Sequence, residues 1–402
     1  MTSSSRPAPS SPAGPAGRRW TGAAGAWLGL GAAPATLTMG AAMADRHGGA
    51  VPIVAVLLGA ALMAALLYGQ GMLGLGSSRA EGGTLTDVAP TYLSPAARTA
   101  VGVLLTLAMI GWNGFNVGLG GASLGTVTSL PEPVGAVLLA AAVLAASYAS
   151  GRLGNRIAVV TTLAALALVA VCVIRLSPPV LPVTADVRGI LPDVAVLVGY
   201  VAVFALRAPD FSHGLAGRRD LLVCVALLVV PASLATLAGA GVWLRTGSPD
   251  VVATLAGTGD IAAFGNLFVT AAVFAPSLTT TYSGALAIRS VRPGLSRTAA
   301  MLTVAVPGTL LAVLRFDLYL LPWLSALAAA LPPLVVPMAA EAWHRRRGGA
   351  PRMIPVWTWG PAGVTATALA LLGVPAASLA GLALALAATA LNAFGRRPAA
   401  FS

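Results

Sequence analysis

The stretch Trp27-Leu-Gly-Leu-Gly-Ala-Ala-Pro-Ala-Thr-Leu-Thr-Met-Gly40 is apolar enough to enter a lipid bilayer, yet its composition argues against one continuous helix. Pro34 removes one backbone hydrogen bond from a helix, and Gly29, Gly31 and Gly40 weaken helix formation on both sides of it. Within hydrocarbon, an interrupted backbone is tolerated only where it is buried in protein or lines a cavity. The stretch therefore predicts a broken membrane helix beside a functional site.

The composition of the whole chain makes lipid its main solvent. Of 402 residues, 57% are hydrophobic and only 9% are charged, against about 45–50% apolar and about 25% charged in a soluble domain. So few charges cannot cover a soluble surface, which excludes a soluble enzyme, a nucleic-acid-binding protein and a disordered protein. The net charge is +12, but all 24 basic residues are arginines dispersed between apolar runs, so nucleic acid is not an expected partner. Cys172 and Cys224 lie within apolar runs and are expected to be buried thiols.

Charge-free intervals predict an all-α polytopic membrane protein with twelve transmembrane helices, because a helix needs about 20 apolar residues to cross a bilayer. The first span lies between Arg19 and Asp45, and the last two lie within Met353–Gly395 with a turn at Gly373–Pro375. The nine between them are Val51–Gln70, Thr99–Gly121, Val134–Gly151, Ile157–Ile174, Val194–Leu206, Leu221–Leu244, Ile261–Ile288, Thr298–Leu314 and Leu318–Ala340.

The first and sixth spans are the irregular ones. In the sixth, only Val194–Leu206 is free of charge, which is short for a membrane helix. A matched pair of short or interrupted helices indicates a transporter built from two inverted repeats, here five-plus-five with broken helices one and six. The alternative is that Gly and Pro are simply common in membrane helices. The expected organisation is a disordered cytosolic tail at 1–19, repeats at 20–174 and 191–340, helices eleven and twelve at 353–395, and a cytosolic tail at 396–402.

The arginines predict the orientation in the plasma membrane. If the N-terminus is cytoplasmic, nineteen arginines fall in cytoplasmic segments and only five in outer loops, a strong positive-inside bias. Those five are Arg46, Arg175, Arg188, Arg245 and Arg315. Both termini are therefore expected to be cytoplasmic. The longest polar loop, Gly71–Arg98, is too short to form a separate soluble domain.

Polar side chains within two spans suggest a binding site, because a polar side chain in a membrane helix is costly to bury and typically marks a functional position. In the third span, Trp112, Phe115 and Asn116 share one helical face and Asn113 adjoins them, so an indole and a carboxamide could stack on and pair with a flat heteroaromatic ligand. The alternatives are a glycine packing motif and an interfacial tryptophan.

In the eighth span, Ala275-Pro-Ser-Leu-Thr-Thr-Thr-Tyr-Ser-Gly284 is dense in hydroxyl groups, although such groups often bond only the carbonyl four residues earlier. No paired carboxylates, metal-ligand spacing or nucleotide-binding motif appears in the sequence, so an enzyme is not expected and no cofactor is indicated.

Four segments resemble the nucleobase:cation symporter family, which includes the cytosine and purine–cytosine permeases. Gly111-Trp-Asn-Gly114 resembles the family's Gly-Trp-Phe-Gly element, and Ala208-Pro-Asp-Phe-Ser-His-Gly-Leu-Ala-Gly-Arg-Arg-Asp220 resembles the segment after its sixth helix. Tyr282-Ser-Gly-Ala-Leu286 resembles its Tyr-Ala-Ser-Gly-Leu run, and Leu324–Pro333 followed by Arg345–Arg347 resembles the end of its tenth helix. Order and spacing hold from about Trp27 to Arg347, and the family has twelve helices in a five-plus-five inverted repeat.

The resemblance implies a substrate site between helices one, three, six and eight. Trp112 would stack on the substrate, Tyr200 or Phe204 would form a second aromatic wall, and Ser277 and Thr279 would face the edge of the base. These hydroxyls stand where the cytosine permeases have amides, so the substrate's identity does not carry over.

The sodium site of the family is not matched. Its two hydroxyl ligands fall on Ala275 and Pro276, while Thr279 and Thr280 lie about one turn away, roughly 5–6 Å. The resemblance therefore does not carry sodium coupling over, and a proton gradient or facilitated exchange is favoured.

The expected function is alternating-access import of a nucleobase or related small heteroaromatic such as cytosine, a purine or hydroxymethylpyrimidine. The expected partners are this substrate and the bilayer, and no obligate protein partner is indicated. The alternatives are an amino-acid permease of the same superfamily and a transport-dead sensor or scaffold.

Overall fold

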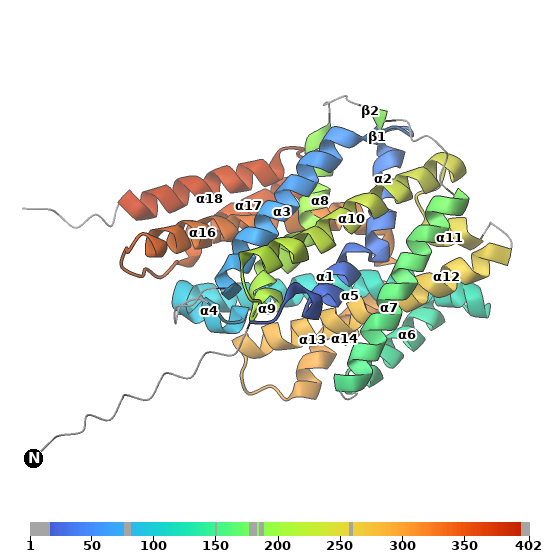
Figure 1. The fold of residues 1–402 in the computed structure, drawn as a ribbon, viewed down its shortest axis with the longest axis horizontal. Coiled ribbons are helices and arrows are strands. Elements are labelled where there is room, and N and C mark those ends of the chain that lie inside the picture. The colour runs from blue at the N-terminus through green and yellow to red at the C-terminus, as the bar shows by residue number, and fades with distance from the viewer. Residues whose placement is uncertain are drawn as a thin grey trace, which may run out of the picture.

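The computed structural model describes residues 17–75, 82–148, 151–176, 183–184, 189–256 and 260–394, and helices make up most of them (Figure 1). Most of the expected N-terminal tail, all of the expected tail at 396–402, and Arg79 and Arg188 lie outside the described residues. The first half of the chain contains η1 (Trp20–Gly22), α1 (Ala24–Gly31), α2 (Pro34–Arg46), β1 (Val51–Pro52), α3 (Ile53–Leu75), α4 (Leu85–Tyr92), α5 (Pro95–Thr128), α6 (Glu132–Ala146), α7 (Gly151–Val171), η2 (Cys172–Leu176) and β2 (Val183–Thr184).

The second half is also helical. It contains α8 (Ile190–Leu206), α9 (Ala208–Ser212), α10 (Arg218–Thr246), α11 (Val251–Ala256), α12 (Asp260–Ala272), α13 (Phe274–Val291), α14 (Arg297–Val313), η3 (Phe316–Tyr319), α15 (Leu320–Ala330), α16 (Pro332–Arg346), η4 (Val356–Thr358), α17 (Gly360–Leu371) and α18 (Ala377–Phe394). Each expected span coincides with one of these helices or with two or more that follow one another directly.

Four spans are broken. The first consists of α1 and α2, the eighth of α12 and α13, and the tenth of η3, α15 and α16, while the sixth is α8, continued beyond Leu206 by α9. The fifth passes from α7 directly into the π-helical η2. Breaks in the first and sixth were predicted, whereas those in the eighth and tenth were not. By length and composition, four helical segments of the described chain could each cross a membrane: Ile53–Leu75, Pro95–Thr128, Arg218–Thr246 and Phe316–Arg346. Most of the others are shorter apolar helices.

Two further details differ from the sequence-based expectations. The polar loop Gly71–Arg98 contains the helix α4, which begins with a capping box: Asp87 accepts hydrogen bonds from the hydroxyl and the backbone N–H of Thr84. These hydrogen bonds also hold the pKa of Asp87 below its ordinary value. In addition, β1 and β2 form a short parallel pair, with Val51 opposite Val183, in a chain expected to be all helical.

The helix α5 is at the centre of the packing and contacts α6, α12, α13 and α14. It has 34 residues and extends beyond the expected span at both ends, from Pro95, where Ser94 caps the first turn, to Thr128. Most of its middle is buried, from Ala108 to Ser123. It therefore carries Trp112 and Asn116 into the interior of the molecule.

Glycines let other helices touch backbone to backbone. A Cβ atom at Gly40 would lie 1.8 Å from the carbonyl oxygen of Thr236, and one at Gly199 would lie 1.8 Å from that of Leu324. The contacts α2–α10 and α8–α15 are thus closer than any side chain would allow. The second contact fixes α8 immediately beside Tyr200.

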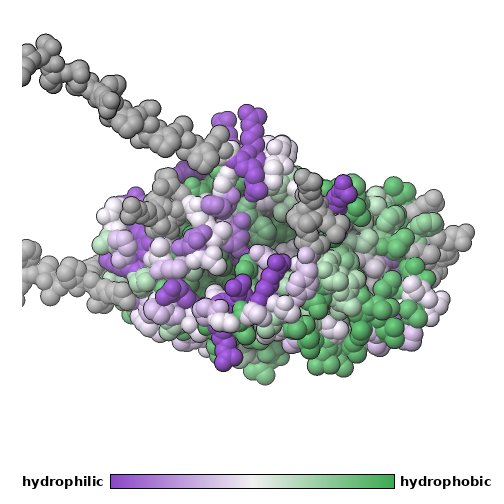
Figure 2. Space-filling view, turned by 90° about the horizontal axis from the view of Figure 1, so that it is seen from below, coloured by the Kyte–Doolittle hydropathy of each residue, from purple (hydrophilic) through white to green (hydrophobic). Residues whose placement is uncertain are grey.

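The outside of the molecule is strongly apolar. Large hydrophobic side chains that are more than half exposed occur on about half of the described α-helices, among them Leu57, Leu107, Leu310 and Val364. In Figure 2 hydrophobic residues dominate the right half, while hydrophilic residues gather at the left, the side on which α4 lies in Figure 1. Exposed apolar area on this scale is what a lipid-facing surface requires.

Candidate functional site

The two predicted breaks have different backbone causes. After α1, Ala32 leaves the helical geometry and Ala33 is extended, with ψ 146°, before Pro34 starts α2. Between α8 and α9 only Arg207 intervenes, with φ −91° and ψ 4°, and Pro209 stands near the start of α9. Pro lacks the N–H that a continuing helix would use, so both interruptions are built into the sequence.

A small cavity lies where these breaks approach α5 and α13. Its volume is about 10 Å³, close to the minimum that one water molecule needs. Its walls are apolar or neutral and polar, and none of its lining residues is charged: Leu30, Ala33, Ala35, Trp112, Asn116, Tyr200, Phe204, Pro276, Thr279 and Thr280. We call these ten residues the central site.

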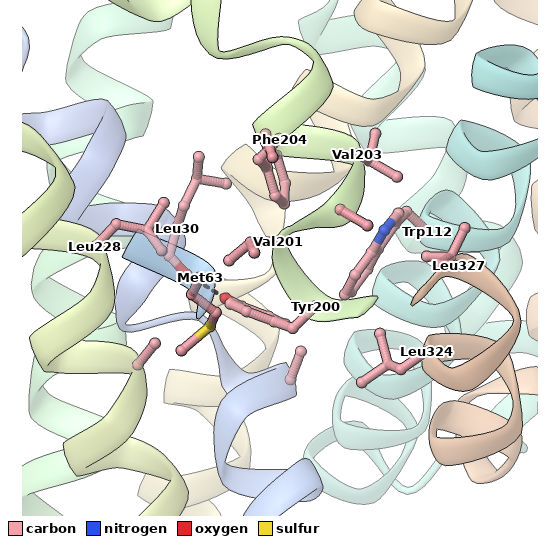
Figure 3. Close-up of a cluster of buried hydrophobic side chains, with 14 of the residues drawn as sticks. Leu30, Met63, Trp112, Tyr200, Val201, Val203, Phe204, Leu228, Leu324 and Leu327 are labelled. Atoms are coloured by element: carbon pink, nitrogen blue, oxygen red, sulfur yellow. Dashed lines mark hydrogen bonds between the residues drawn. The ribbon is translucent and has the colours of Figure 1, made fainter. Parts of the chain in front are cut away.

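Aromatic rings form one side of the central site (Figure 3). The ring centroid of Trp112 lies 5.8 Å from that of Tyr200, with planes at 78°, and 6.3 Å from that of Phe204, with planes at 47°. The Tyr200 hydroxyl donates a hydrogen bond to the carbonyl oxygen of Leu30, which ties α8 to the broken end of α1. Both residues suggested for the second aromatic wall therefore adjoin Trp112.

Three polar groups of the central site have no partner among the described residues. The indole N–H of Trp112 is buried and unpaired. Asn116 uses its amide N–H on the carbonyl oxygen of Trp112, at 2.8 Å, which leaves its side-chain oxygen as an acceptor. The hydroxyl of Thr279 makes no hydrogen bond in the described part of the chain, whereas that of Thr280 donates to the Ser277 carbonyl at 3.0 Å. Because buried polar groups are normally paired, the buried indole N–H suits a ligand with an acceptor. The Asn116 oxygen and the half-buried Thr279 hydroxyl add an acceptor and a group that can donate or accept.

Asn113 and Ser277 lie outside the central site. The Asn113 amide donates to the hydroxyl of Thr281 at 2.9 Å, and its oxygen lies against Gly308 of α14. The Ser277 hydroxyl donates to the carbonyl of Val273 at 2.7 Å. Asn113 is about 100° around α5 from Trp112, so it joins α5 to α13 and α14 instead of facing the cavity.

A second, much larger cavity adjoins the central site. Its volume is about 680 Å³, and it shares Leu30, Pro276 and Thr279 with the central site. Trp27 and Phe211 also line it and make an edge contact, with centroids 6.2 Å apart. Sequence reasoning assigned no role to these two residues, although both lie in segments it singled out. The central site is therefore separated from a wide cavity by only a few side chains.

The positions matching the family's sodium ligands are not rich in side-chain oxygens. Ala275 and Pro276 line the large cavity, and neither carries a hydroxyl. Thr279 carries a hydroxyl and lines both cavities. No group of three or more His, Cys, Asp or Glu side chains that could hold a metal ion occurs within the described residues.

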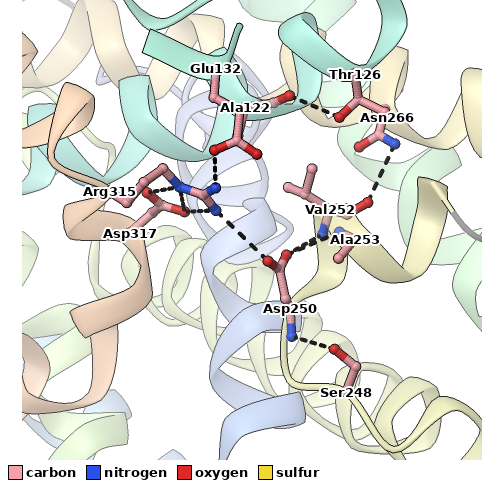
Figure 4. A network of polar contacts seen from close by, with 10 residues as sticks. All are labelled: Ala122, Thr126, Glu132, Ser248, Asp250, Val252, Ala253, Asn266, Arg315 and Asp317. Atoms are coloured by element: carbon pink, nitrogen blue, oxygen red, sulfur yellow. Dashed lines mark hydrogen bonds and ion pairs between the residues drawn. The ribbon is translucent and has the colours of Figure 1, made fainter.

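An ionic network lies beside the C-terminal part of α5 (Figure 4). Arg315 forms hydrogen bonds to Asp317 at 3.1 and 3.0 Å, is paired with Glu132 at the start of α6, and lies 3.8 Å from Asp250 before α11. Asp317 is 3% exposed. Burial lowers the pKa of Arg315, but the hydrogen bonds to Asp317 and Glu132 raise it above its ordinary value, so the guanidinium stays charged. We call these four residues the Arg315 network.

No family model and no curated protein matches the sequence. Solved structures match throughout the chain. An inward-facing conformation of Mhp1 is similar with a TM-score of 0.72, 17% identity, and coverage of 96% of this chain and 95% of that one. A closed conformation of Mhp1, a nucleobase-cation-symport-1 family transporter with bromovinylhydantoin bound, gives a TM-score of 0.71 at 17% identity, covering 96% and 97%.

A transporter of another kind has a similar fold at lower sequence identity. A mutant manganese transporter from Eremococcus coleocola gives a TM-score of 0.60 at 13% identity, covering 97% of this chain and 91% of that one. At these identities the similarity concerns the fold. The chain is thus a multi-pass helical membrane protein with the fold of these transporters.

Proposed function

We propose that this protein is a secondary active transporter that imports a nucleobase or a related small heteroaromatic, such as cytosine, a purine or hydroxymethylpyrimidine. The observation that carries the proposal is the central site, where Trp112, Tyr200 and Phe204 meet two helix breaks inside the molecule. Membership of the nucleobase:cation symporter family is part of the proposal and is supported by the motifs and by the similarity to Mhp1.

The polar groups of the central site suit a heteroaromatic ring. A flat ring stacked on the face of Trp112 could donate an N–H to the Asn116 oxygen. The indole N–H points out of the edge of Trp112, so it would bond a ligand acceptor that lies beside the indole in its plane. Thr279 would supply a hydroxyl that can do either. The cavity is too small for a ring as it stands, so binding requires the side chains around it to move.

The amino-acid permease alternative fits less well. An amino acid carries an ammonium and a carboxylate, and burying either without a partner costs much more than burying a neutral polar group. Charged side chains are absent from the lining of the central site, so only backbone groups at the helix breaks could pair with these charges. A neutral substrate is therefore favoured.

The proposed outer and cytoplasmic sides of the molecule differ in how they are closed, and this difference supports transport by alternating access. The proposed topology has twelve spans in a five-plus-five repeat and places both termini, α4 and α9 in the cytoplasm, with α11 and the Arg315 network outside. The network then closes the outer side, while the large cavity extends from the central site towards Arg18 at the start of the described chain. This arrangement corresponds to an inward-facing state.

The function is tested by uptake of labelled compounds into proteoliposomes. We expect uptake of at least one nucleobase or related heterocycle, saturable and competed by the unlabelled compound, and no uptake of amino acids. Liposomes without protein provide the control. Uptake of an amino acid alone would favour the permease alternative, and binding of a heterocycle without any uptake would favour a sensor.

Thiol labelling tests the topology. Cys172 and Cys224 are buried, so the parent should give little background. Arg245, Arg218 and Arg292 are exposed, and each can be replaced by Cys. We expect an impermeant reagent added to intact cells to label Arg245→Cys, and to label Arg218→Cys and Arg292→Cys only after the membrane is opened. One reversed position would contradict the proposed orientation.

Sodium is not expected to drive uptake. A sodium site in this position needs several oxygens from the broken first helix and from α13, and Ala275 and Pro276 offer no hydroxyl. At fixed pH and membrane potential, replacing choline by sodium outside the vesicles should leave the initial rate unchanged. A steep rise with sodium would contradict this and would make Thr279 and Thr280 the candidate ligands.

A further inference from the structure

A third cavity lies apart from the central site, among α4, the first turns of α5, α9 and the last turns of α13. Its volume is about 530 Å³. None of the ten residues of the central site lines it. It is adjacent to the 680 Å³ cavity only at Asp210, which lines both.

Three charged side chains line this cavity, and two of them are cationic. Arg98 is exposed and pairs with no carboxylate among the described residues. Arg207 donates from Nε to Asp210 at 2.7 Å and from Nη2 at 2.6 Å, while its buried Nη1 has no partner. The cavity therefore carries an excess of positive charge.

Both oxygens of Asp210 are already engaged, and neither pairs with Arg98. One carboxylate oxygen accepts from the backbone N–H of Leu85 at 2.6 Å, and the other accepts from Arg207. This carboxylate links the start of α4 to the hinge between α8 and α9. The donors of Arg98 are left for a different anion. Nη1 of Arg207 is buried and unpaired, so an anion reaches this guanidinium only when Arg207 moves away from Asp210.

Hydroxyl and apolar groups complete the lining. The hydroxyls of Tyr282 and Ser283 make no hydrogen bond within the described part of the chain, and both residues line the cavity. Leu105 and Leu286 form part of an apolar wall. Charge-assisted donors with adjacent hydroxyls and apolar surface match a phosphate group that can carry an apolar substituent.

We propose that this cavity binds a phosphate-type oxyanion through Arg98, Arg207 and Ser283, either inorganic phosphate or the headgroup of an anionic phospholipid. The site is separate from the transported substrate and does not depend on the proposed function. A bound anion would compete with Asp210 for Arg207, at the residue that separates α8 from α9, and would thereby act on the geometry of the sixth span.

Thermal unfolding of the purified full-length protein tests the proposal. In detergent, inorganic phosphate is expected to raise the unfolding midpoint saturably above that in sodium chloride of equal ionic strength. Arg98→Gln should need about tenfold more phosphate for the same rise, as expected when one charge-assisted contact is lost. Arg219→Gln is the matched control, because Arg219 is also exposed and lies outside the cavity. It should respond like the parent.

A second measurement separates the two sources of the anion. The parent, Arg98→Gln and Ser283→Ala are compared in nanodiscs of phosphatidylcholine alone and with added phosphatidylglycerol. A midpoint rise with the anionic lipid that is reduced in both variants and kept in Arg219→Gln assigns the site to a headgroup, and a response to phosphate alone assigns it to the free ion. Equal responses of Arg98→Gln and Arg219→Gln, or no response of the parent to either probe, would overturn the proposal.

Discussion

Trp112→Ala is expected to weaken binding of a confirmed heteroaromatic substrate by about 1–3 kcal/mol, the range measured for stacking of a base on an aromatic side chain. That corresponds to roughly a 5- to 150-fold rise in Kd. Trp112 is 3% exposed, and its ring meets Tyr200 and Phe204 at the central site. Removing the indole takes away both the stacking surface and the unpaired N–H.

Two further variants separate stacking from packing. Trp112→Phe keeps an aromatic ring and should retain part of the affinity. Because this variant preserves most of the packing, it still tests stacking if the Ala variant folds poorly. Phe115→Leu is the matched control, because Phe115 contacts Trp112 at a centroid distance of 5.9 Å and does not line the cavity. It should lower stability without a comparable loss of binding, measured by calorimetric titration. If Trp112→Ala binds as tightly as the parent, the indole serves packing alone.

The sequence predicted the broken first and sixth spans because their causes are local. Pro34 follows two glycines within a few residues, and Arg207 is followed by Pro209, so the interruption can be seen in the chain itself. The break at Val273 in the eighth span also has a local cause, because Pro276 lacks the N–H that would bond the Ala272 carbonyl and its ring crowds that carbonyl. This proline was not interpreted as a helix break in the sequence. The helix α4 also escaped notice because eight residues between polar loops form no membrane-length apolar run.

The part of the candidate site that lies on one helix was predictable, because residues three or four positions apart face the same side of a helix. Trp112 and Asn116 are four residues apart on α5, and both line the cavity. Asn113 is next to Trp112 in sequence, but the turn of the helix points it towards Thr281. The Arg315 network could not be foreseen, because its members come from three separate parts of the chain, around 132, 250 and 315–317. Their proximity depends on tertiary packing, which local patterns do not contain.

Arg315→Ala is expected to destabilise the protein by about 3–5 kcal/mol, the usual cost of removing one partner of a buried ion pair. Asp317 is 3% exposed and is held by Arg315 through Nε and Nη2. A Cβ atom at Gly118 would come within 2.8 Å of its Oδ1, so α5 packs directly against the carboxylate. The charge left behind would be neither solvated nor paired. Denaturant unfolding in detergent measures the loss.

The other members of the network provide the controls for Arg315→Ala. Glu132 has a side chain that is 45% exposed, so Glu132→Gln should cost less than about 1 kcal/mol, as for other solvent-screened pairs. The double variant Arg315→Ala/Asp317→Asn leaves a neutral side chain of the same shape in place of the orphaned charge and should recover a large part of the stability. If the single and double variants are equally unstable, the guanidinium matters through its packing and not through its charge. If Glu132→Gln costs as much as Arg315→Ala, the energy lies in the exposed pair and Asp317 is not the residue that makes Arg315 necessary.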